Sequence, residues 1–131
     1  MESKLILITG ATSGIGKETA KALAKQGHTV IVHGRDKEKT QKVCAEIKSA
    51  TGNDRVDMLL ADLFLLSDVK RMADEFKQKY DRLDVLINNA GGMMNKVRET
   101  TTEGLEKTIA LNLLAPFLLS ELLLKIITGN V

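Results

Sequence analysis

The chain has 131 residues, and 44% of them are hydrophobic, which is enough for one compact domain with a buried core. The net charge of +2 argues against a nucleic-acid-binding protein and against an acidic tail. A single cysteine, Cys44, excludes an internal disulfide, and no Cys/His cluster indicates a metal site. We therefore expect one domain over residues 1–131, with no nucleic-acid partner and no metal ion.

The start of the chain contains a short apolar run that begins at Leu5 and stops at Ile8. The apolar region of a signal peptide is longer, about 7 to 15 residues. We therefore expect a cytoplasmic protein. The run itself, Leu-Ile-Leu-Ile, is typical of a buried parallel strand.

A glycine-rich turn over residues 9–16 follows this strand and leads into a helix over residues 17–25. Ile15, Thr19 and Leu23 recur every four residues, as on one face of an amphipathic helix. Such a turn lets a phosphate approach the backbone, and the N–H groups and dipole of the new helix attract the anion. The alternative is a structural turn that needs glycine and binds nothing. The candidate ligand residues here are Gly10, Thr12, Ser13, Gly14, Ile15 and Gly16.

A second strand is predicted over residues 29–32, where the sequence is short, apolar and β-branched. Arg35 and Asp36 follow it. In a dinucleotide-binding fold this exit faces the adenosine ribose, where an acidic residue binds a free 2′-hydroxyl and an arginine accommodates a 2′-phosphate. The alternative is that Arg35 is a solvated residue of a charged loop. His28 and His33 flank the strand, and we expect them to be ordinary surface or edge residues.

A helix over residues 37–50 is expected to bury Cys44, and it leads to a third strand over residues 56–60. Asp62 and Leu63 follow that strand directly. A carboxylate here lies at the carboxyl end of a parallel strand, which is the edge of an open α/β sheet where ligands bind. The alternatives for Asp62 are a loop aspartate and a cap for the next helix.

A third helix is predicted over residues 67–80, with Ser67 as its N-cap, and a fourth strand over residues 83–87. This strand ends in Asn88-Asn89-Ala90-Gly91. Adjacent side-chain amides can tie strand ends together through hydrogen bonds to the backbone, and the small residues after them leave room for a ribose. Turn chemistry alone is the alternative explanation.

Residues 92–102 are polar and are expected to form a loop, and a very apolar helix is predicted from residue 103 to about residue 127. Asn112 lies alone among apolar residues, so its amide needs a hydrogen-bond partner. Pro116 is expected to kink the helix, because proline removes a backbone donor. We expect no membrane span, since Asn112, Glu121 and Lys125 interrupt the apolar stretch.

The last helix carries more apolar residues than one buried face requires. A large apolar surface exposed in a monomer favours self-association. We therefore expect self-association through this helix or limited solubility, with a homodimer as the orderly outcome. The apolar residues concerned are Leu118, Leu119, Leu122, Leu123, Leu124, Ile126 and Ile127.

Three segments together resemble the short-chain dehydrogenase/reductase family. They are Thr-Gly-x-x-x-Gly-Ile-Gly over residues 9–16, Asn-Asn-Ala-Gly over residues 88–91, and Ala-Leu-Asn-x-Leu-x-Pro-Phe-Leu-Leu over residues 110–119. The third is most similar to retinol-dehydrogenase-like and related bacterial members. The resemblance implies an α/β fold of the Rossmann type: a doubly wound parallel sheet, here of about four strands in the order 3-2-1-4, with helices on both faces.

The resemblance also implies a dinucleotide cofactor and a small carbonyl or alcohol substrate. In this family a Gly-Arg pair after the second strand usually goes with NADP, so Arg35 favours NADP over NAD. Asp62 and Leu63 would contact the adenine ring, and Asn112 would be the catalytic asparagine that supports a water in a proton relay. The residues expected at the cofactor are Gly10, Thr12, Ser13, Gly14, Ile15, Gly16, Arg35, Asp62, Leu63, Asn89, Ala90 and Gly91.

The sequence departs from the family at the catalytic residues. The family's chemistry needs a serine after a fifth strand and a Tyr-x-x-x-Lys pair on the next helix, where the tyrosine transfers a proton and the lysine lowers its pKa. Neither is present: Asp84 follows Tyr80 by four residues, and Ser120 lies within the last helix. We therefore expect a dinucleotide-binding fold that stops before strand five, with Asn112 as a catalytic remnant.

Two functions from different classes follow. The first is an NADP-dependent carbonyl or alcohol oxidoreductase that is catalytically incomplete as this chain. The second is a nucleotide-binding or assembly module without catalysis of its own.

Overall fold

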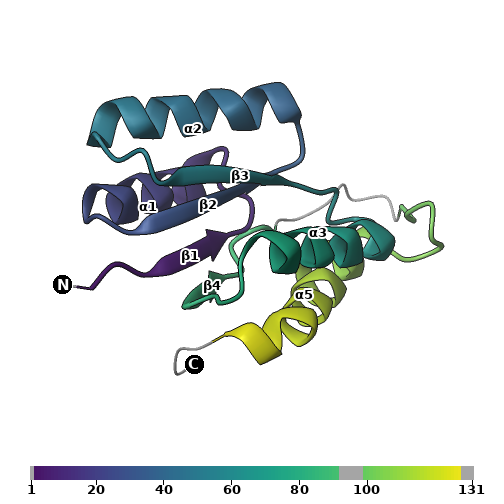
Figure 1. Ribbon diagram of the computed structural model, residues 1–131. Coiled ribbons are helices and arrows are strands. Elements are labelled where there is room, and N and C mark those ends of the chain that lie inside the picture. The colour runs from purple at the N-terminus through teal and green to yellow at the C-terminus, as the bar shows by residue number, and fades with distance from the viewer. Residues whose placement is uncertain (1, 92–98, 128–131) are drawn as a thin grey trace.

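The computed structural model describes residues 2–91 and 99–127; part of the predicted loop, residues 92–98, lies outside the described residues. The described residues form a parallel sheet with the strand order β3-β2-β1-β4, as predicted (Figure 1). In its register, Ile6 pairs with Val30 on one side and with Val85 on the other. All four strands therefore end at the same edge of the sheet. The strands are β1 (Leu5–Ile8), β2 (Thr29–Gly34), β3 (Val56–Leu60) and β4 (Val85–Ile87).

Helices cover both faces of the sheet, so the predicted doubly wound fold is confirmed (Figure 1). One face carries α1 (Gly14–Lys25) and α2 (Lys37–Thr51), and the other carries α3 (Leu66–Lys79) and α5 (Ala115–Leu123). The side chains of β1 alternate between the two layers. Ile6 and Ile8 pack in the cluster with α1 and α2, whereas Leu5 and Leu7 pack in the cluster with α3 and α5. A strand that is apolar throughout is therefore buried throughout.

The buried face of α1 is not the face that the four-residue repeat marks. Ile15 is 81% exposed, and the buried residues are Gly16, Ala20 and Ala24. A spacing of four residues fits either face, so the period alone does not determine which face is buried. At Gly16 only glycine fits, because α1 begins against the preceding turn: a Cβ there would lie 2.5 Å from the Gly10 carbonyl oxygen.

The cap of α3 also differs from the prediction, because the helix begins at Leu66 and Ser67 lies inside its first turn. The cap is the carboxylate of Glu103. Its Oε1 accepts from the Leu66 N–H over 2.5 Å, and its Oε2 accepts from the Ser67 N–H over 3.1 Å. A residue far along the chain therefore satisfies the free N–H groups of this helix.

The last helix is shorter than predicted and is not uniform, since residues 103–106 are not helical. The helical path consists of α4 (Lys107–Ile109), the π-helical segment η1 (Ala110–Leu114), α5, and the 3₁₀ turn η2 (Leu124–Ile126). In η1 the Ala115 N–H donates to the Ala110 carbonyl, five residues back. This wider turn directly precedes Pro116, so the disturbance expected at the proline takes the form of a π-bulge.

The helix over Lys107–Ile126 is long and apolar enough to cross a membrane, judged by length and composition alone. In the folded chain its inner side belongs to the core, because Ala115, Leu119 and Leu123 are buried among α3 and the sheet. The prediction that Leu119 and Leu123 are surplus apolar residues is therefore wrong.

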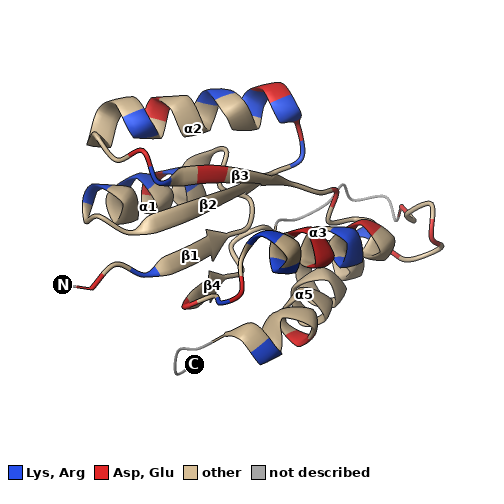
Figure 2. Cartoon of the chain, viewed as in Figure 1, with Lys and Arg blue, Asp and Glu red and all other residues tan. Residues whose placement is uncertain are grey.

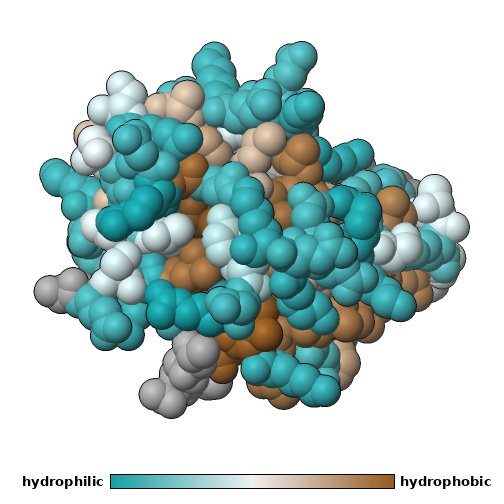
Figure 3. Space-filling view, viewed as in Figure 1, coloured by the Kyte–Doolittle hydropathy of each residue, from teal (hydrophilic) through white to brown (hydrophobic). Residues whose placement is uncertain are grey.

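The outer side of the same helix is apolar and exposed. Charged residues lie mainly on the outer faces of α1, α2 and α3, whereas α5 carries few (Figure 2). Figure 3 shows apolar surface gathered below α3, where α5 lies. Three exposed side chains form what we call the exposed apolar stripe: Leu113, Phe117 and Leu124.

Candidate functional site

The segments that directly follow the four strands, which we call the strand exits, lie side by side at the carboxyl edge of the sheet. The Ala11 N–H, after β1, donates to the His33 carbonyl near the end of β2 over 3.0 Å. The Ala61 N–H, after β3, donates to the Gly34 carbonyl over 3.1 Å. The Asn89 N–H, after β4, donates to Thr9 Oγ over 3.0 Å. The segments predicted to form a site therefore meet, at the edge where ligands of open α/β sheets bind.

The glycines of the turn have separate structural reasons. Gly10 has φ +61° and Gly14 has φ +56°, a region that favours glycine. A Cβ at Gly10 would lie 2.8 Å from Ala90 Cα, whereas a Cβ at Gly14 would meet no atom within 4 Å. Ser13, the N-cap of α1, makes no capping hydrogen bond with its side chain. Gly10 thus packs the turn against the exit of β4, and Gly14 leaves the N-terminus of α1 open to an anion.

The other two candidate ligand residues in the turn, Thr12 and Ile15, lie on opposite sides of it. Thr12 packs beside the end of β2, since a Cβ at Gly34 would lie 2.6 Å from the Thr12 methyl carbon. Ile15 projects outward and lines a shallow surface groove that runs from the turn along α1 to Leu23. The turn therefore has one side against β2 and one side open.

His33 is a site residue that the sequence reasoning misplaced. It is 3% exposed and lies within β2, where we expected a surface or edge residue. Its Nδ1 accepts from the Gly10 N–H over 2.9 Å, and its Nε2 lies 3.0 Å from the Ala61 carbonyl oxygen. Burial lowers the pKa of the imidazole below its usual value, so the ring is neutral at pH 7. His28 was misplaced in the same way: it is buried, and its Nδ1 accepts from the Lys4 N–H.

Asn89 ties two strand ends together, as predicted for this motif. Its Nδ2 donates to the Gly10 carbonyl over 3.0 Å, and the N–H groups of Asn89 and Ala90 both donate to Thr9 Oγ over 3.0 Å. Asn88 differs, because its amide lies 3.2 Å from Ser120 Oγ on α5. The pair of asparagines thus joins the exit of β4 to the glycine-rich turn and to a helix.

Arg35 and Asp36 have different partners. Asp36 is the N-cap of α2, since its Oδ1 accepts from the Lys39 N–H over 2.9 Å. Arg35 has a side chain that is 71% exposed, and its Nε lies 3.8 Å from Asp62 Oδ2. The guanidinium is therefore available at the edge, whereas the neighbouring carboxylate is engaged by its own helix.

Asp62 and Leu63 form the exit of β3. Asp62 Oδ1 accepts from the Phe64 N–H over 3.0 Å, and the Asp62 N–H donates to Asp68 Oδ2. The carboxylate is thus part of a local turn and also faces Arg35, and it is not the N-cap of α3, which is Leu65. The Leu63 side chain is buried in the core, which leaves its main chain at the edge.

Asn112 lies on the π-helical segment and is exposed, so it is not the buried core residue that its apolar neighbours suggested. It lies against the exit of β4: a Cβ at Gly91 would be 2.7 Å from Asn112 Oδ1. The structure therefore brings the predicted catalytic asparagine to the same edge as the predicted cofactor residues.

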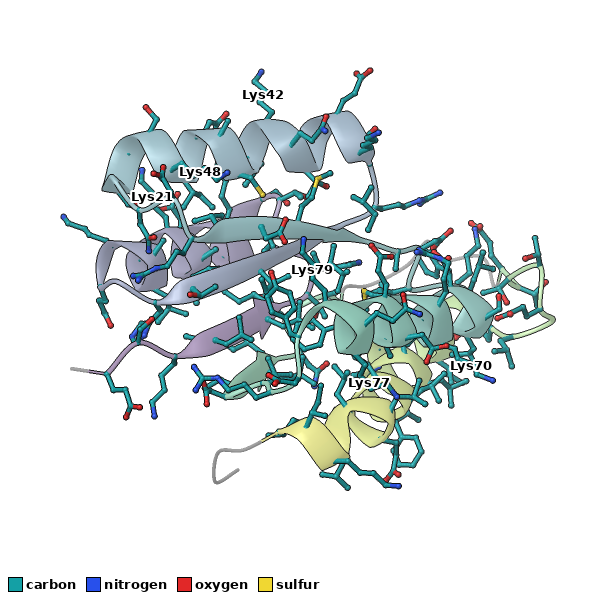
Figure 4. The ribbon with its side chains drawn as sticks, in the orientation of Figure 1. Lys21, Lys42, Lys48, Lys70, Lys77 and Lys79 are labelled. Atoms are coloured by element: carbon teal, nitrogen blue, oxygen red, sulfur yellow. The ribbon has the colours of Figure 1, made fainter. Side chains whose placement is uncertain are left out.

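Tyr80 and Cys44 lie away from this edge, around Asp57 of β3. The Tyr80 hydroxyl donates to Asp57 Oδ2 over 2.9 Å, and Lys79 forms an ion pair with the same oxygen (Figure 4). Burial, with help from Asp57, raises the pKa of the Tyr80 phenol. Burial also raises the pKa of the Cys44 thiol to about 11, as expected for an unreactive buried cysteine. Over residues 2–91 and 99–127, no group of three or more His, Cys, Asp or Glu could hold a metal ion.

Comparison with known proteins decides the family. The family model described as short chain dehydrogenase matches residues 4–130. The chain belongs to the short chain dehydrogenase family. Its Rossmann-type sheet and its glycine-rich turn are those that the family resemblance implied.

Three proteins that are similar to this chain are each longer than it is. Polyprenol dehydrogenase from Homo sapiens is 43% identical over 121 residues, which are 92% of this chain and 36% of the relative. Retinol dehydrogenase 11 from Homo sapiens is 42% identical over 125 residues, which are 95% of this chain and 39% of the relative. A short chain dehydrogenase from Shigella flexneri 2a complexed with NADP is 32% identical, with a TM-score of 0.79, covering 96% of this chain and 54% of that chain. This chain therefore spans less than half the length of the two curated relatives.

Proposed function

We propose that this chain binds NADP(H) and forms the dinucleotide-binding part of an oxidoreductase that acts on a small carbonyl or alcohol. Membership of the short chain dehydrogenase family supports the class of reaction, and a solved relative in complex with NADP supports the cofactor. One observation carries the choice of NADP over NAD. Arg35 is exposed at the edge, whereas Asp36, which a 2′-hydroxyl would need, is occupied as the N-cap of α2.

Each part of the dinucleotide has a proposed place on the edge. The pyrophosphate would lie at the N-terminus of α1, where Gly14 leaves open space. The 2′-phosphate would pair with Arg35, and the adenine would lie at Asp62 and the Leu63 main chain. The ribose nearer the reaction would lie beside Ala90 and Gly91. The proposed cofactor residues are Gly10, Thr12, Ser13, Gly14, Ile15, Gly16, Arg35, Asp62, Leu63, Asn89, Ala90 and Gly91.

A second candidate function is a nucleotide-binding or assembly module without catalysis. Residues 1–131 contain one tyrosine, and no Tyr-x-x-x-Lys pair. The exposed apolar stripe favours assembly, and we propose a homodimer formed through it. We also infer that the helix over Lys107–Ile126 belongs to the folded domain of a cytoplasmic protein and does not cross a membrane, because its inner side is packed in the core.

Calorimetric titration of the chain with NADPH and NADH tests the proposal. NADPH should bind more tightly, and Arg35→Ala should weaken NADPH by about 1 to 3 kcal/mol, roughly 5- to 150-fold, with no effect on NADH. Lys42→Ala is the matched control, because Lys42 lies on α2 and points away from the sheet (Figure 4). It removes the same charge and should leave both affinities unchanged.

Asp36→Asn completes the test, since asparagine is also a good N-cap. It should leave the affinity for NADH unchanged, because the carboxylate serves the helix and not the ribose. Equal affinities of the wild type for the two cofactors, or a loss of NADH binding in Asp36→Asn, would contradict the choice of NADP.

A further inference from the structure

His33 contacts the glycine-rich turn with its side chain and with its main chain. Nδ1 accepts from the Gly10 N–H over 2.9 Å, and the carbonyl oxygen accepts from the Ala11 N–H over 3.0 Å. On the other side of the ring, Nε2 lies 3.0 Å from the Ala61 carbonyl oxygen. A carbonyl can only accept, so Nε2 carries the proton and Nδ1 is the acceptor. The two contacts therefore select a single neutral tautomer.

Gly10 is consequently held at both of its polar groups. Its N–H donates to His33, which belongs to β2, and its carbonyl accepts from the Asn89 amide, which follows β4. Between these two contacts the backbone adopts φ +61°. A turn fixed in this way has less conformational freedom to lose when a ligand binds, which favours affinity.

We propose that His33 is a positioning residue that holds the glycine-rich turn in its binding conformation and thereby sets the affinity for the pyrophosphate of the dinucleotide. This inference rests on the proposed function for the identity of the ligand. The imidazole does not itself touch the ligand. It acts through the Gly10 N–H, and it links that residue to Ala61 at the exit of β3.

Protonation of His33 would remove the contact. A proton on Nδ1 would place two donors, Nδ1–H and the Gly10 N–H, against each other. The charged group that acts on the ring is Asp68 on α3, whose carboxylate is bound by Arg71. Burial lowers the pKa of His33 and outweighs the Ala61 hydrogen bond and the Asp68 charge, which raise it. Nucleotide affinity should therefore be highest at neutral pH, where the ring is neutral. It should fall in acid, at a pH below the usual histidine pKa of 6.5.

The test compares the wild type with His33→Asn and His33→Leu. Asparagine can place Oδ1 where Nδ1 lies and cannot titrate, whereas leucine fills the space and leaves the Gly10 N–H without an acceptor. His33→Leu should weaken NADPH binding at pH 7.5 by about tenfold or more, because a partly buried donor loses its partner. His33→Asn should bind NADPH better than His33→Leu does. Binding of 2′-AMP, which has the adenosine and the 2′-phosphate but no pyrophosphate, should be the same in all three proteins.

The pH profile separates positioning from general stability. The 2′-phosphate of NADPH titrates near a pKa of about 6 in every variant, so the profile of His33→Asn is the reference. The wild type should lose NADPH affinity more steeply than His33→Asn as the pH falls through the pKa of His33, which burial holds below 6.5. NADPH binding by His33→Leu equal to that of the wild type would overturn the inference.

Amide hydrogen exchange gives a readout without nucleotide. The Gly10 N–H should be protected in the wild type and in His33→Asn, and should exchange faster in His33→Leu, while the amides of Val30 and Val32 in β2 keep their protection. Faster exchange across all of β2, or unchanged exchange at Gly10, would overturn the positioning role. A wild type that binds neither NADPH nor NADH but shows the exchange pattern would contradict the proposed function and leave the contact to Gly10 supported.

Discussion

At the residue scale, two glycines share a positive φ and open space around the Cα, but they lie at different places in the fold. Gly14 has φ +56° and Gly52 has φ +72°, and a Cβ at either would meet no atom within 4 Å. Valine at either position should therefore fold, at a cost of about 1 to 2 kcal/mol for the left-handed conformation. Only Gly14 lies at the open N-terminus of α1. We expect Gly14→Val to lose NADPH binding, because its side chain blocks the approach of a phosphate.

Gly52→Val is the control for strain alone. Thermal unfolding followed by circular dichroism should give similar Tm values for the two variants, and calorimetry should show that only Gly52→Val still binds NADPH. Retained binding by Gly14→Val would mean that the turn is structural.

The residues of the edge differ in how far the sequence predicted them. Asn89 was predicted to tie strand ends, because an amide directly after an apolar strand has backbone groups within reach. His33 was predicted at the surface, because the apolar run stops at Val32. Pairing with Leu59 extends β2 to Gly34 and buries the imidazole, and such pairing between distant segments is not visible in a local pattern. Parallel strands are buried on both faces, so any residue that continues such a strand becomes a candidate for burial.

At the element scale, α3 depends on a carboxylate from another segment. Hydrogen bonds from the Ser67 hydroxyl, and from the N–H groups of Ser67 and Leu66, lower the pKa of Glu103 below its usual 4.5. The pKa of Glu103 is thus lower in the folded than in the unfolded chain. Its contribution to stability is complete above pH 4.5 and is lost as the pH falls through the folded value. We expect the Tm of the wild type to fall more steeply below pH 4.5 than that of Glu103→Gln.

Glu18→Gln is the matched control for this prediction, because Glu18 is an exposed glutamate on the first helix. Thermal scans between pH 3 and pH 7 should give parallel curves for Glu18→Gln and the wild type. Parallel curves for Glu103→Gln and the wild type would show that the cap contributes nothing measurable.

The bounds of helices and strands were predicted well where local sequence determines them. They were predicted poorly where contacts with distant segments determine them. The strand Val56–Leu60 has the predicted bounds, because a mainly apolar segment that begins directly after Arg55 defines it. The start of α3 was predicted one residue late, because its cap comes from Glu103 and not from Ser67. A disturbance near Pro116 follows from the missing N–H, but the local sequence does not specify that it takes the π-helical form seen over Ala110–Leu114.

At the scale of the whole molecule, the exposed apolar stripe predicts self-association. Phe117 is 65% exposed and Leu113 is 61% exposed, on the outer side of a helix with few charges. We expect the wild type to form dimers at high concentration in light scattering. Phe117→Gln should weaken the dimer by about 1.5 to 3 kcal/mol if the side chain is fully buried in it. Ala22→Gln adds the same amide to an exposed position of α1 and should change nothing. A wild type that is monomeric at every concentration would contradict this prediction.

The arrangement of the whole sheet also predicts that residues 1–131 alone do not turn over carbonyl or alcohol substrates with NADP(H). Hydride transfer needs a proton delivered to the developing alkoxide beside the nicotinamide. Asn112 lies at the correct edge, next to Gly91, but an amide can only orient a water. Tyr80 donates a hydrogen bond to Asp57 on β3. β3 and β4 are the two outermost strands of the sheet, and Asn112 lies beside Gly91, which follows β4. The raised pKa of Tyr80 further disfavours proton release.

NADPH absorbance followed with a panel of aldehydes, ketones and retinoids should therefore show no turnover by the purified chain, while calorimetry shows NADPH binding. A trace of host reductase would mimic activity, so Asn112→Ala and Tyr80→Phe are measured beside the wild type after identical purification. Contaminating activity would be equal in all three preparations. Turnover in the wild type that Asn112→Ala or Tyr80→Phe abolishes would contradict the prediction, because it would show that one of these two side chains takes part in proton transfer despite the geometry that separates them.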